Sequence, residues 1–240
     1  MEEKIDQLIA SYTPSDAAIE VLGDVAIVLL AGISGAGKDT IKKRLLASGE
    51  YHNIVTHTTR APRENDGVLE QDGVEYHFID KETSLHMLEN KGYIEANRYG
   101  SNIYGTSVAE FVAARDEKRI AIADIDVNGV ASFKKLSPNT VRPIFLTPPS
   151  YAVWRDRWMT RYNGVKYSPE DYASRLQTAI DEIEHVLATE YYFVVINDNL
   201  DEAVAETDAI ARTGMQDAVR KQAGVDFLKI MLAEMKADLR

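Results

Sequence analysis

The chain has 240 residues, of which 45% are hydrophobic and 27% are charged, a balance that is ordinary for a soluble globular protein. It contains no cysteine, so a disulfide framework and a thiolate metal site are both excluded. The formal net charge is −11, which argues against broad nucleic-acid binding, and an anionic substrate would therefore need locally clustered basic groups.

The sequence shows no export or membrane signal. Its start, MEEKIDQLIA, is acidic and lacks the basic flank and apolar run of a signal peptide. The longest strongly apolar run, Val25 to Ala31, is far shorter than a membrane span. We therefore expect a cytoplasmic protein that binds neither membranes nor nucleic acid.

Apolar strands and helical segments alternate along the chain. Residues 1–22 are expected to be helical, with a stop and restart at 13–15. Strands separated by helices predict an α/β fold with a mostly parallel, doubly wound sheet. We expect strands at 24–32, 54–57, 74–79, 93–97, 119–126, 141–147 and 192–197, and helices at 38–46, 81–91, 106–116 and through most of 151–187.

The tail from residue 201 is expected to be helical, with Gly214 and Gly224 as possible breaks. Its last segment, 225–239, has the spacing of an amphipathic helix. The simplest expectation is a helix packed on the domain. The predicted apolar face consists of Phe227, Ile230, Met231, Met235 and Leu239.

Residues 32–40, GISGAGKDT, match the phosphate-loop pattern G-x-x-x-x-G-K-[ST] except at Asp39. The stretch lies between a buried strand and a helix, which is the context that this motif requires. The glycines let backbone N–H groups turn toward phosphates, and Lys38 would reach the β- and γ-phosphates. The candidate ATP-binding residues here are Gly32, Ser34, Gly35, Ala36, Gly37, Lys38, Asp39 and Thr40.

Asp39 places a negative charge where the pattern has a hydroxyl. Two unit charges about 4 Å apart repel by roughly 4 kcal/mol at an effective dielectric near 20. The repulsion becomes acceptable if Mg²⁺ lies between the carboxylate and the phosphates, because magnesium favours carboxylates and retained waters. Thr40 would then supply the displaced hydroxyl.

An ordered series of short motifs beyond the loop resembles guanylate kinase. The motifs are TTRAPR at 58–63, EYHF at 75–78, YGTS at 104–107, DIDVNG at 124–129 and IND at 196–198. The resemblance runs from the loop to about residue 212. It implies Mg²⁺-dependent transfer of the ATP γ-phosphoryl group to GMP or dGMP, giving ADP and GDP. It also implies a P-loop NTPase-type fold with an inserted GMP-binding lobe and a helical lid.

Guanine presents N1–H and N2–H donors beside the O6 acceptor, which suit a carboxylate and a hydroxyl. The resemblance assigns the carboxylate to Glu95, hydroxyls to Thr56 and Thr106, and a contact on the nucleoside side to Asp126. Arginines and tyrosines of the motifs match the family's ligands of the GMP phosphate. The implied GMP-binding set is Thr56, Arg60, Arg63, Tyr76, Glu95, Tyr104, Thr106 and Asp126.

Phosphoryl transfer requires cations around the transferring group. The resemblance places Arg157 and Arg161 on the family's lid arginines and Arg175 on the helix after the lid. Asn197 matches a contact to the adenine of ATP. The implied catalytic residues are Lys38, Arg60, Arg157, Arg161 and Arg175, and the implied magnesium ligands are Asp39, Thr40 and a Walker-B-like Asp124.

The resemblance also divides the chain into parts. Helical extensions at 1–22 and 213–240 fall outside it, and support of a homodimer and capping of the core are both open as their role. The P-loop core is expected at 23–56, 119–150 and 188–212, the GMP-binding lobe at 57–118, and the lid with its following helix at 151–187.

Two other functions remain open at this stage. The stretch 64–75 is longer than the family's usual spacer, which leaves room for a related kinase acting on another nucleoside monophosphate or a phosphorylated sugar. The other is an inactive guanylate-kinase-like interaction module that holds a peptide in the GMP pocket. Such modules generally lose the phosphate loop and the lid arginines, whereas this chain keeps Lys38, Arg157 and Arg161.

Overall fold

The computed structural model describes residues 2–65, 67–161 and 168–239, apart from the side chains of Asn65, Arg161 and Pro169. Within these residues, no helix is both long enough and apolar enough to cross a membrane. The chain forms two compact units. The first unit comprises 1–26, 51–123 and 136–140, and the second comprises 27–50, 124–135 and 141–240.

The second unit contains three parallel strands, β1 (Ile27–Gly32), β10 (Val141–Thr147) and β11 (Phe193–Ile196), with β10 between the other two. Every residue of β1 is buried, which explains its continuous apolar sequence. Parallel strands have their carboxyl ends at one edge of the sheet, where ligands of open α/β sheets bind. The phosphate loop follows the carboxyl end of β1 at this edge.

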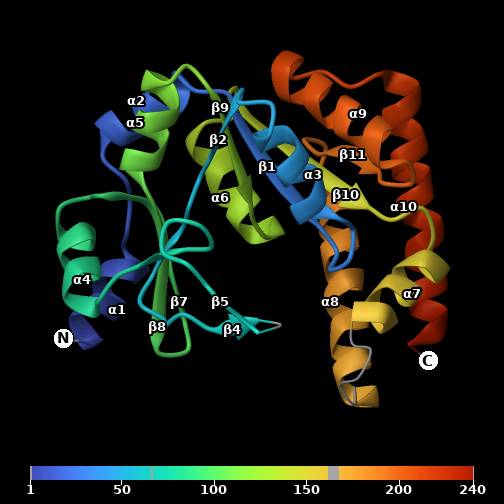
Figure 1. Cartoon of the computed structure of the whole chain (residues 1–240), viewed down its shortest axis with the longest axis horizontal. Helices are drawn as coiled ribbons and strands as arrows, with labels where there is room; N and C mark the ends of the chain where they lie inside the picture. The colour runs from blue at the N-terminus through green and yellow to red at the C-terminus, as the bar shows by residue number, and fades with distance from the viewer. Residues whose placement is uncertain (1, 66, 162–167, 240) are drawn as a thin grey trace. The chain divides into compact units, whose positions relative to one another are not determined.

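Helices flank these strands (Figure 1). α3 packs on β1 and α9, α9 packs on β10 and β11, and α10 runs along β11 and α8. α8 begins with a capping box in which Ser168 and Asp171 satisfy each other's backbone N–H groups. The helices of this unit are α3 (Lys38–Leu46), α6 (Val127–Leu136), α7 (Tyr151–Arg161), α8 (Pro169–Leu187), α9 (Leu200–Thr213) and α10 (Ala218–Asp238).

The first unit is built on a small sheet with the order β6-β3-β8-β7, in which β7 and β8 form a long antiparallel pair. Its other strands are a parallel pair, β2 with β9, and a short hairpin, β4 with β5. The strands are β2 (Tyr51–Asn53), β3 (His57–Thr58), β4 (Glu64–Asn65), β5 (Val68–Leu69), β6 (His77–Phe78), β7 (Tyr93–Tyr99), β8 (Asn102–Ser107) and β9 (Ile120–Asp124).

Four helices complete the first unit: α1 (Glu2–Ala10), α2 (Asp16–Gly23), α4 (Lys81–Glu89) and α5 (Val108–Asp116). α1 contributes to the core, because the fully buried Ile5 packs with Leu88, Tyr93 and Ile103. Tyr12 follows α1, and its hydroxyl donates to the Tyr93 carbonyl at 2.7 Å and accepts from the Tyr93 N–H at 3.0 Å. The amino-terminal helix therefore braces strand β7.

The predicted α/β class with a mostly parallel sheet flanked by helices is confirmed. The helix predicted at 38–46 and the restart after 13–15 are also confirmed. The strand predicted at 54–57 is wrong, because pairing with β9 ends at Asn53 and pairing with β8 begins at His57. Strand β8 was not predicted, since its sequence NIYGTS alternates weakly and its partner β7 fixes it.

Two expectations about the tail are corrected. Gly224 does not break the helix but lies within α10, where a Cβ would come 2.8 Å from the Cβ of Val194. The buried face contains Leu228 together with the predicted Met231 and Met235, whereas Ile230 is 62% exposed. The helix turns its glycine toward β11, and this close approach sets which face is buried.

Candidate active site

The phosphate loop joins β1 to α3 in a conformation that requires glycine at two positions. Gly32 has φ +148° and a Cβ there would lie 2.3 Å from the Leu146 carbonyl oxygen. Gly37 has φ +92° and a Cβ there would lie 2.3 Å from Nδ2 of Asn197. Because side chains fit at neither position, the loop backbone can approach a phosphate closely.

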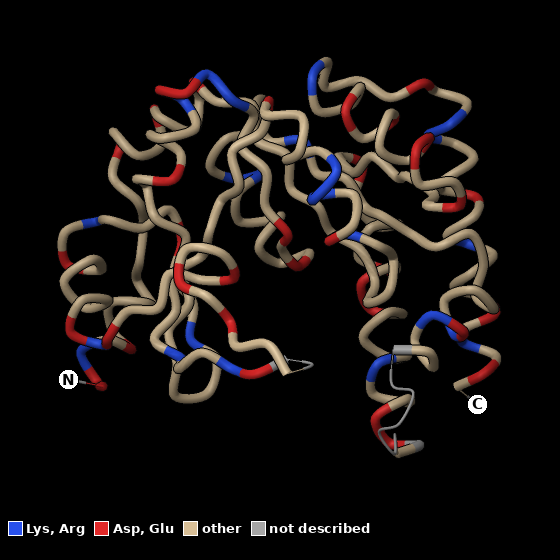
Figure 2. The backbone as a smooth tube through the Cα atoms, viewed as in Figure 1, with Lys and Arg blue, Asp and Glu red and all other residues tan. Residues whose placement is uncertain are grey.

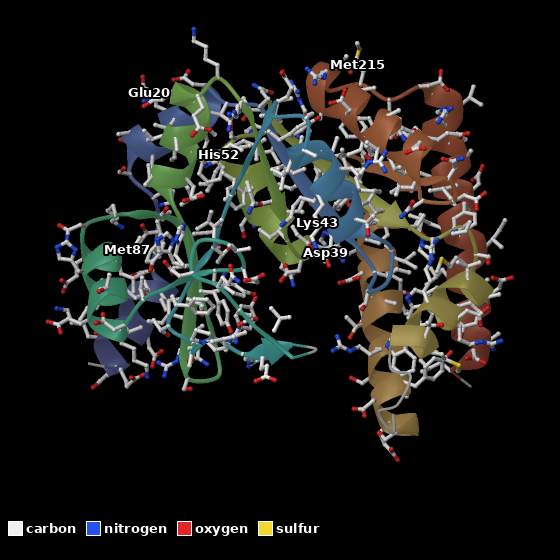
Figure 3. The ribbon with its side chains drawn as sticks, viewed as in Figure 1. Glu20, Asp39, Lys43, His52, Met87 and Met215 are labelled. Carbon is white, nitrogen blue, oxygen red and sulfur yellow. The ribbon has the colours of Figure 1, made fainter. Side chains whose placement is uncertain are left out.

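Lys38 begins α3 and extends back along the loop, where its Nζ donates to the Gly32 carbonyl at 2.6 Å. Figure 3 shows Asp39 at the loop end of α3, with Lys43 one turn further along. The loop forms one wall of a cavity of about 420 Å³. The residues around this cavity are Gly32, Ser34, Gly35, Gly37, Lys38, Asp39, Thr40, Asp124, Arg175, Thr178, Ala179 and Glu182.

The predicted magnesium ligands Asp39, Thr40 and Asp124 all line this cavity. The cavity walls strip water from Asp124 and raise its pKa, as does the neighbouring Asp39 carboxyl, while Lys38 opposes the rise. No group of three or more acidic, histidine or cysteine side chains in the described part of the chain could enclose a metal by itself. Mg²⁺ commonly binds through one or two carboxylates plus phosphates and water, so the donor set fits this ion.

Asn197 supports the loop from the end of β11. Its Nδ2 donates to the Ala36 carbonyl at 2.8 Å, and only 7% of its surface is exposed. Arg157, on α7, donates to the Asn197 carbonyl at 3.3 Å and thus lies beside the residue that supports the loop, and its catalytic role stays a prediction. The contact of Asn197 with adenine stays a prediction. Ala36 is fully buried, so it shapes the loop through its backbone.

Arg175 and Glu182 line the cavity from α8. Burial raises the pKa of Glu182 to about 7, while Lys38 and Arg175 oppose this rise, and its Oε2 has no hydrogen-bond partner among the residues that the structure describes. Sequence reasoning missed Glu182. Its spacing from Arg175, two helical turns, was the available signal, because residues so spaced share one face of a helix. The side chain of Arg161, the other predicted lid arginine, lies outside the described residues.

Glu95 and Thr106 face each other in the first unit. They are paired in the β7–β8 ladder, and the Thr106 hydroxyl donates to Oε1 of Glu95 at 2.9 Å. Asn97 donates to Oε2 of the same carboxylate at 2.6 Å. Two donors thus fix the orientation of an acceptor-only group, as reading the edge of a base requires.

Arg60 lies near the two predicted phosphate-binding tyrosines. Its guanidinium carbon is 5.2 Å from the centre of the Tyr76 ring, and the Tyr76 and Tyr104 rings are 5.9 Å apart. Arg60 is 8% exposed and forms an ion pair with Glu70, with an N–O distance of 2.9 Å. The structure therefore brings Tyr76 and Tyr104 together beside the buried guanidinium of Arg60.

Glu70 was not among the predicted site residues. It accepts from Arg60 and from the Arg63 N–H at 2.8 Å, so it ties the lengthened stretch to the arginine motif. A single carboxylate in a turn-rich, acidic stretch gives no sequence signal of its partner. Only the hairpin of β4 and β5, which brings residue 70 back beside residue 63, reveals it.

Three further GMP ligands were predicted, namely Thr56, Arg63 and Asp126. Arg63 has an exposed side chain, and Thr56 is partly buried with its carbonyl bonded to the His77 N–H at 3.0 Å. Asp126 belongs to the second unit, where its carboxylate accepts from the Gly129 N–H at 2.8 Å. Their contacts with GMP stay predictions.

Charge along the chain is mixed: acidic and basic segments are interspersed in both units (Figure 2). The candidate anion sites therefore depend on individually placed cations. In the second unit these are Lys38, Arg157 and Arg175, and in the first unit the central one is Arg60. This placement meets the requirement that the net charge of −11 imposes on an anionic substrate.

Known proteins resemble this chain over most of its length. The family model for guanylate kinase matches residues 25–213. The guanylate kinase of Clostridium perfringens is 32% identical over 212 residues, covering 88% of this chain and 91% of that protein. That of Thermus thermophilus is 35% identical over 184 residues, covering 77% of this chain and 79% of that protein.

A solved structure agrees with the sequence relatives. The crystal structure of guanylate kinase from Anaplasma phagocytophilum aligns with a TM-score of 0.58 at 25% identity, covering 86% of this chain and 94% of that one. The residues matched by the family model extend from β1 and its phosphate loop through the Arg60 and Glu95 groups to α9. The chain belongs to the guanylate kinase family.

Proposed function

We propose that this protein transfers the γ-phosphoryl group of ATP to GMP or dGMP in a Mg²⁺-dependent reaction, giving ADP and GDP. One observation carries the proposal: a chain of this family combines a glycine-built phosphate loop with a carboxylate held by Thr106 and Asn97. The first suits a triphosphate, and the second suits a guanine. An inactive interaction module would need only the second.

On the ATP side, Lys38 and the loop N–H groups bind the β- and γ-phosphates. Arg157 and Arg175 add positive charge from α7 and α8, and the catalytic set proposed from the sequence also includes Arg60 and Arg161. Phosphoryl transfer depends mainly on position and on stabilisation of negative charge, so fixed cations supply most of the catalysis. The GMP phosphate is itself anionic, so no general base is required.

On the GMP side, the Glu95 carboxylate accepts the N1–H and N2–H of guanine, and the Thr106 hydroxyl turns its single proton from Glu95 to the O6 acceptor when guanine binds. Adenine offers an acceptor at N1, so it would face the acceptor-only carboxylate unfavourably. A site that hydrogen-bonds a polar group can reject an analogue lacking it by about 10⁴-fold. Arg60, Tyr76 and Tyr104 bind the GMP phosphate, for which the planar guanidinium is well suited.

Asp39, Thr40 and Asp124 would hold Mg²⁺, which supplies positive charge next to the transferring phosphoryl group. The pKa of Asp124 is raised partly by the Asp39 carboxyl, and a cation between the two would relieve this repulsion. We expect Asp39→Ala to raise the Mg²⁺ concentration for half-maximal rate several-fold, measured by titrating Mg²⁺ at constant ATP. An unchanged requirement with a faster reaction would show that Asp39 is not a ligand.

The function is tested by ADP release with GMP, dGMP, AMP, UMP and dTMP, each with and without Mg²⁺. We expect turnover with GMP and dGMP only, and only when Mg²⁺ is present. Equal rates with other nucleoside monophosphates, or turnover of a phosphorylated sugar, would favour a related kinase. Binding of GMP with zero turnover would favour the interaction module.

A further inference from the structure

Helix α10 lies beyond the residues that the family model matches, yet it is tied closely to strand β11. Just before it, the Gln216 side chain donates to the Val194 carbonyl at 2.8 Å and accepts from the Val194 N–H at 3.3 Å. Gly224 then lets the helix backbone approach Val194. These contacts satisfy a strand edge and fix the path of α10 along it.

The far end of α10 contacts both helices that adjoin residues 162–167. Oδ2 of Asp238 accepts hydrogen bonds from the hydroxyls of Tyr151, the first residue of α7, and Tyr172, in the first turn of α8, the latter at 2.8 Å. The two hydroxyls lie 2.6 Å apart. A second link is the ion pair of Lys236 with Glu184 of α8.

The same tyrosines belong to an aromatic cluster that reaches the phosphate loop. Tyr151 stacks on Trp154 with ring centres 5.7 Å apart, and Trp158 meets Tyr172 edge to face at 5.3 Å. The indole N–H of Trp154 donates to the Ser34 carbonyl at 2.8 Å. A continuous series of contacts therefore connects the phosphate loop, α7, α8 and the end of α10.

We propose that Asp238 is a positioning residue for phosphoryl transfer: by accepting both tyrosine hydroxyls, it fixes α7 against α8 and so sets where Arg157 and Arg175 stand against the ATP phosphates. This inference rests on the function and the arginine roles proposed above. Displacement of a catalytic group by about 1 Å can cost on the order of 10²-fold in rate, so the alignment of the two helices has a direct kinetic effect.

The chemistry of the contact suits this role. A hydrogen bond from a hydroxyl to a carboxylate is short and about twice as strong as a neutral one. The Tyr151 and Tyr172 hydroxyls hold the pKa of Asp238 below its usual range, and Arg155 on α7 acts in the same direction. Asp238 is therefore a carboxylate at neutral pH.

A purely structural role for α10 would depend on different residues. Its packing on the unit comes from Leu228, Met231 and Met235, which are all nearly fully buried. Asp238 is the last residue of α10 and its own side chain is exposed, whereas its partner Tyr151 is buried. Removal of Asp238 leaves the Tyr151 hydroxyl without its carboxylate acceptor, so it should loosen α7 against α8 and lower the stability of the fold only modestly.

The test compares Asp238→Ala and Asp238→Asn with Asp226→Ala in the full-length protein. Asp226 is a matched control, since its carboxylate lies on the same helix and its ion pair is with Lys229 of that helix. We expect Asp238→Ala to lower kcat about tenfold with KM for GMP within about twofold of wild type. Asp238→Asn keeps an acceptor for the hydroxyls and should restore most of the rate. The urea midpoint of Asp238→Ala should fall slightly, those of Asp238→Asn and Asp226→Ala should match wild type, and every variant should stay folded under the assay conditions.

A double-mutant comparison strengthens the test. Tyr172→Phe should lower kcat in the same sense, and Tyr172→Phe with Asp238→Ala should cost little more than Asp238→Ala alone. Fluorescence of Trp154 and Trp158 should shift in Asp238→Ala and stay unchanged in Asp226→Ala.

Three results would overturn the inference. One is a kcat of Asp238→Ala equal to that of the Asp226→Ala control, in an active wild-type background. Another is a loss of rate that only follows a lower urea midpoint, which would show a structural role. The third is absence of GMP-dependent ADP release by wild type, which would overturn the proposed function itself and this inference with it.

Discussion

The two units hold their candidate cations in different ways. In the second unit, Lys38 bonds to a backbone carbonyl of its own loop and faces a cavity shared with Asp39, Asp124 and Glu182. In the first unit, Arg60 is buried and paired with the Glu70 carboxylate. One cation faces a cavity, and the other is engaged within a tight polar cluster.

The assembly of the two sites differs as well. The loop residues of the second unit are consecutive, so one strand–loop–helix segment places them together. Glu95 and Thr106 meet only because β7 and β8 pair in a particular register, and that register is shifted near Tyr93. A binding group that depends on strand register is more sensitive to remote packing than one built from a local turn.

The largest expected effect is on kcat and comes from a substitution in the second unit that should leave GMP binding by the first unit unchanged. Lys38→Ala should lower kcat at least about a hundredfold, because a fixed charge on the transferring phosphoryl group is lost. GMP affinity, measured by calorimetry without ATP, should remain within about twofold, since the GMP ligands of the first unit are untouched. Lys43→Ala, an exposed lysine on the same helix, is the matched control and should retain full activity. A parallel loss of GMP affinity in Lys38→Ala would show that GMP binding also depends on the phosphate loop of the second unit.

The converse substitution is Glu95→Gln. Its amide would present an N–H group to a guanine donor, so kcat/KM for GMP should fall about a hundredfold while KM for ATP changes little. Steady-state kinetics with each nucleotide varied in turn measure both values. Glu82→Gln, on an exposed position of α4, should behave as wild type. Retention of GMP preference in Glu95→Gln would remove Glu95 from guanine recognition.

The contrast between local and long-range assembly also explains which elements and contacts could be predicted from the sequence alone. The strand at 27–32, the loop and α3 follow from a contiguous apolar run, a glycine pattern and a helix start. Strand β8 and the partner of Arg60 could not be read in this way. Both depend on pairing between segments whose own sequences are weakly patterned.

The candidate residues lie together in the structure where residue chemistry coincided with a motif. Lys38, Asp39, Thr40, Asp124 and Arg175 line one cavity, while their roles toward ATP stay predictions. The supporting contacts lay beyond sequence reasoning, because a helix face indicates burial but not the partner. Asp238 is the clearest case, since nothing in the pattern of α10 links it to Tyr151 and Tyr172.

A smaller effect concerns the brace on the first unit. Tyr12→Phe removes a hydroxyl that bonds both the N–H and the carbonyl of Tyr93, beside the shifted register of β7. The free energy of unfolding should fall by about 1–2 kcal/mol, as measured by urea denaturation. Tyr99→Phe, at a position that is 57% exposed, is the control and should change stability by less. Equal changes in the two variants would show that Tyr12 does not brace the strand.

The smallest expected effect is a pH dependence specific to the second unit. The pKa of Glu182 is about 7 in the folded protein against an ordinary value of 4.5, because burial disfavours its charged form. Between these values the folded state binds a proton that the unfolded state has lost, so Glu182 costs stability as pH rises through this window.

Glu182→Gln removes the ionisation. The variant should therefore be more stable than wild type at pH 8, on the order of 1 kcal/mol because water in the cavity screens the charge, and the gain should disappear toward pH 4.5. Urea unfolding at a series of pH values, without nucleotide or Mg²⁺, measures this difference. Glu234→Gln, at an exposed position of α10, should show no such trend. A pH-independent difference between Glu182→Gln and wild type would mean that Glu182 ionises as an exposed carboxylate, and the cavity of the second unit would then be more hydrated than its walls suggest.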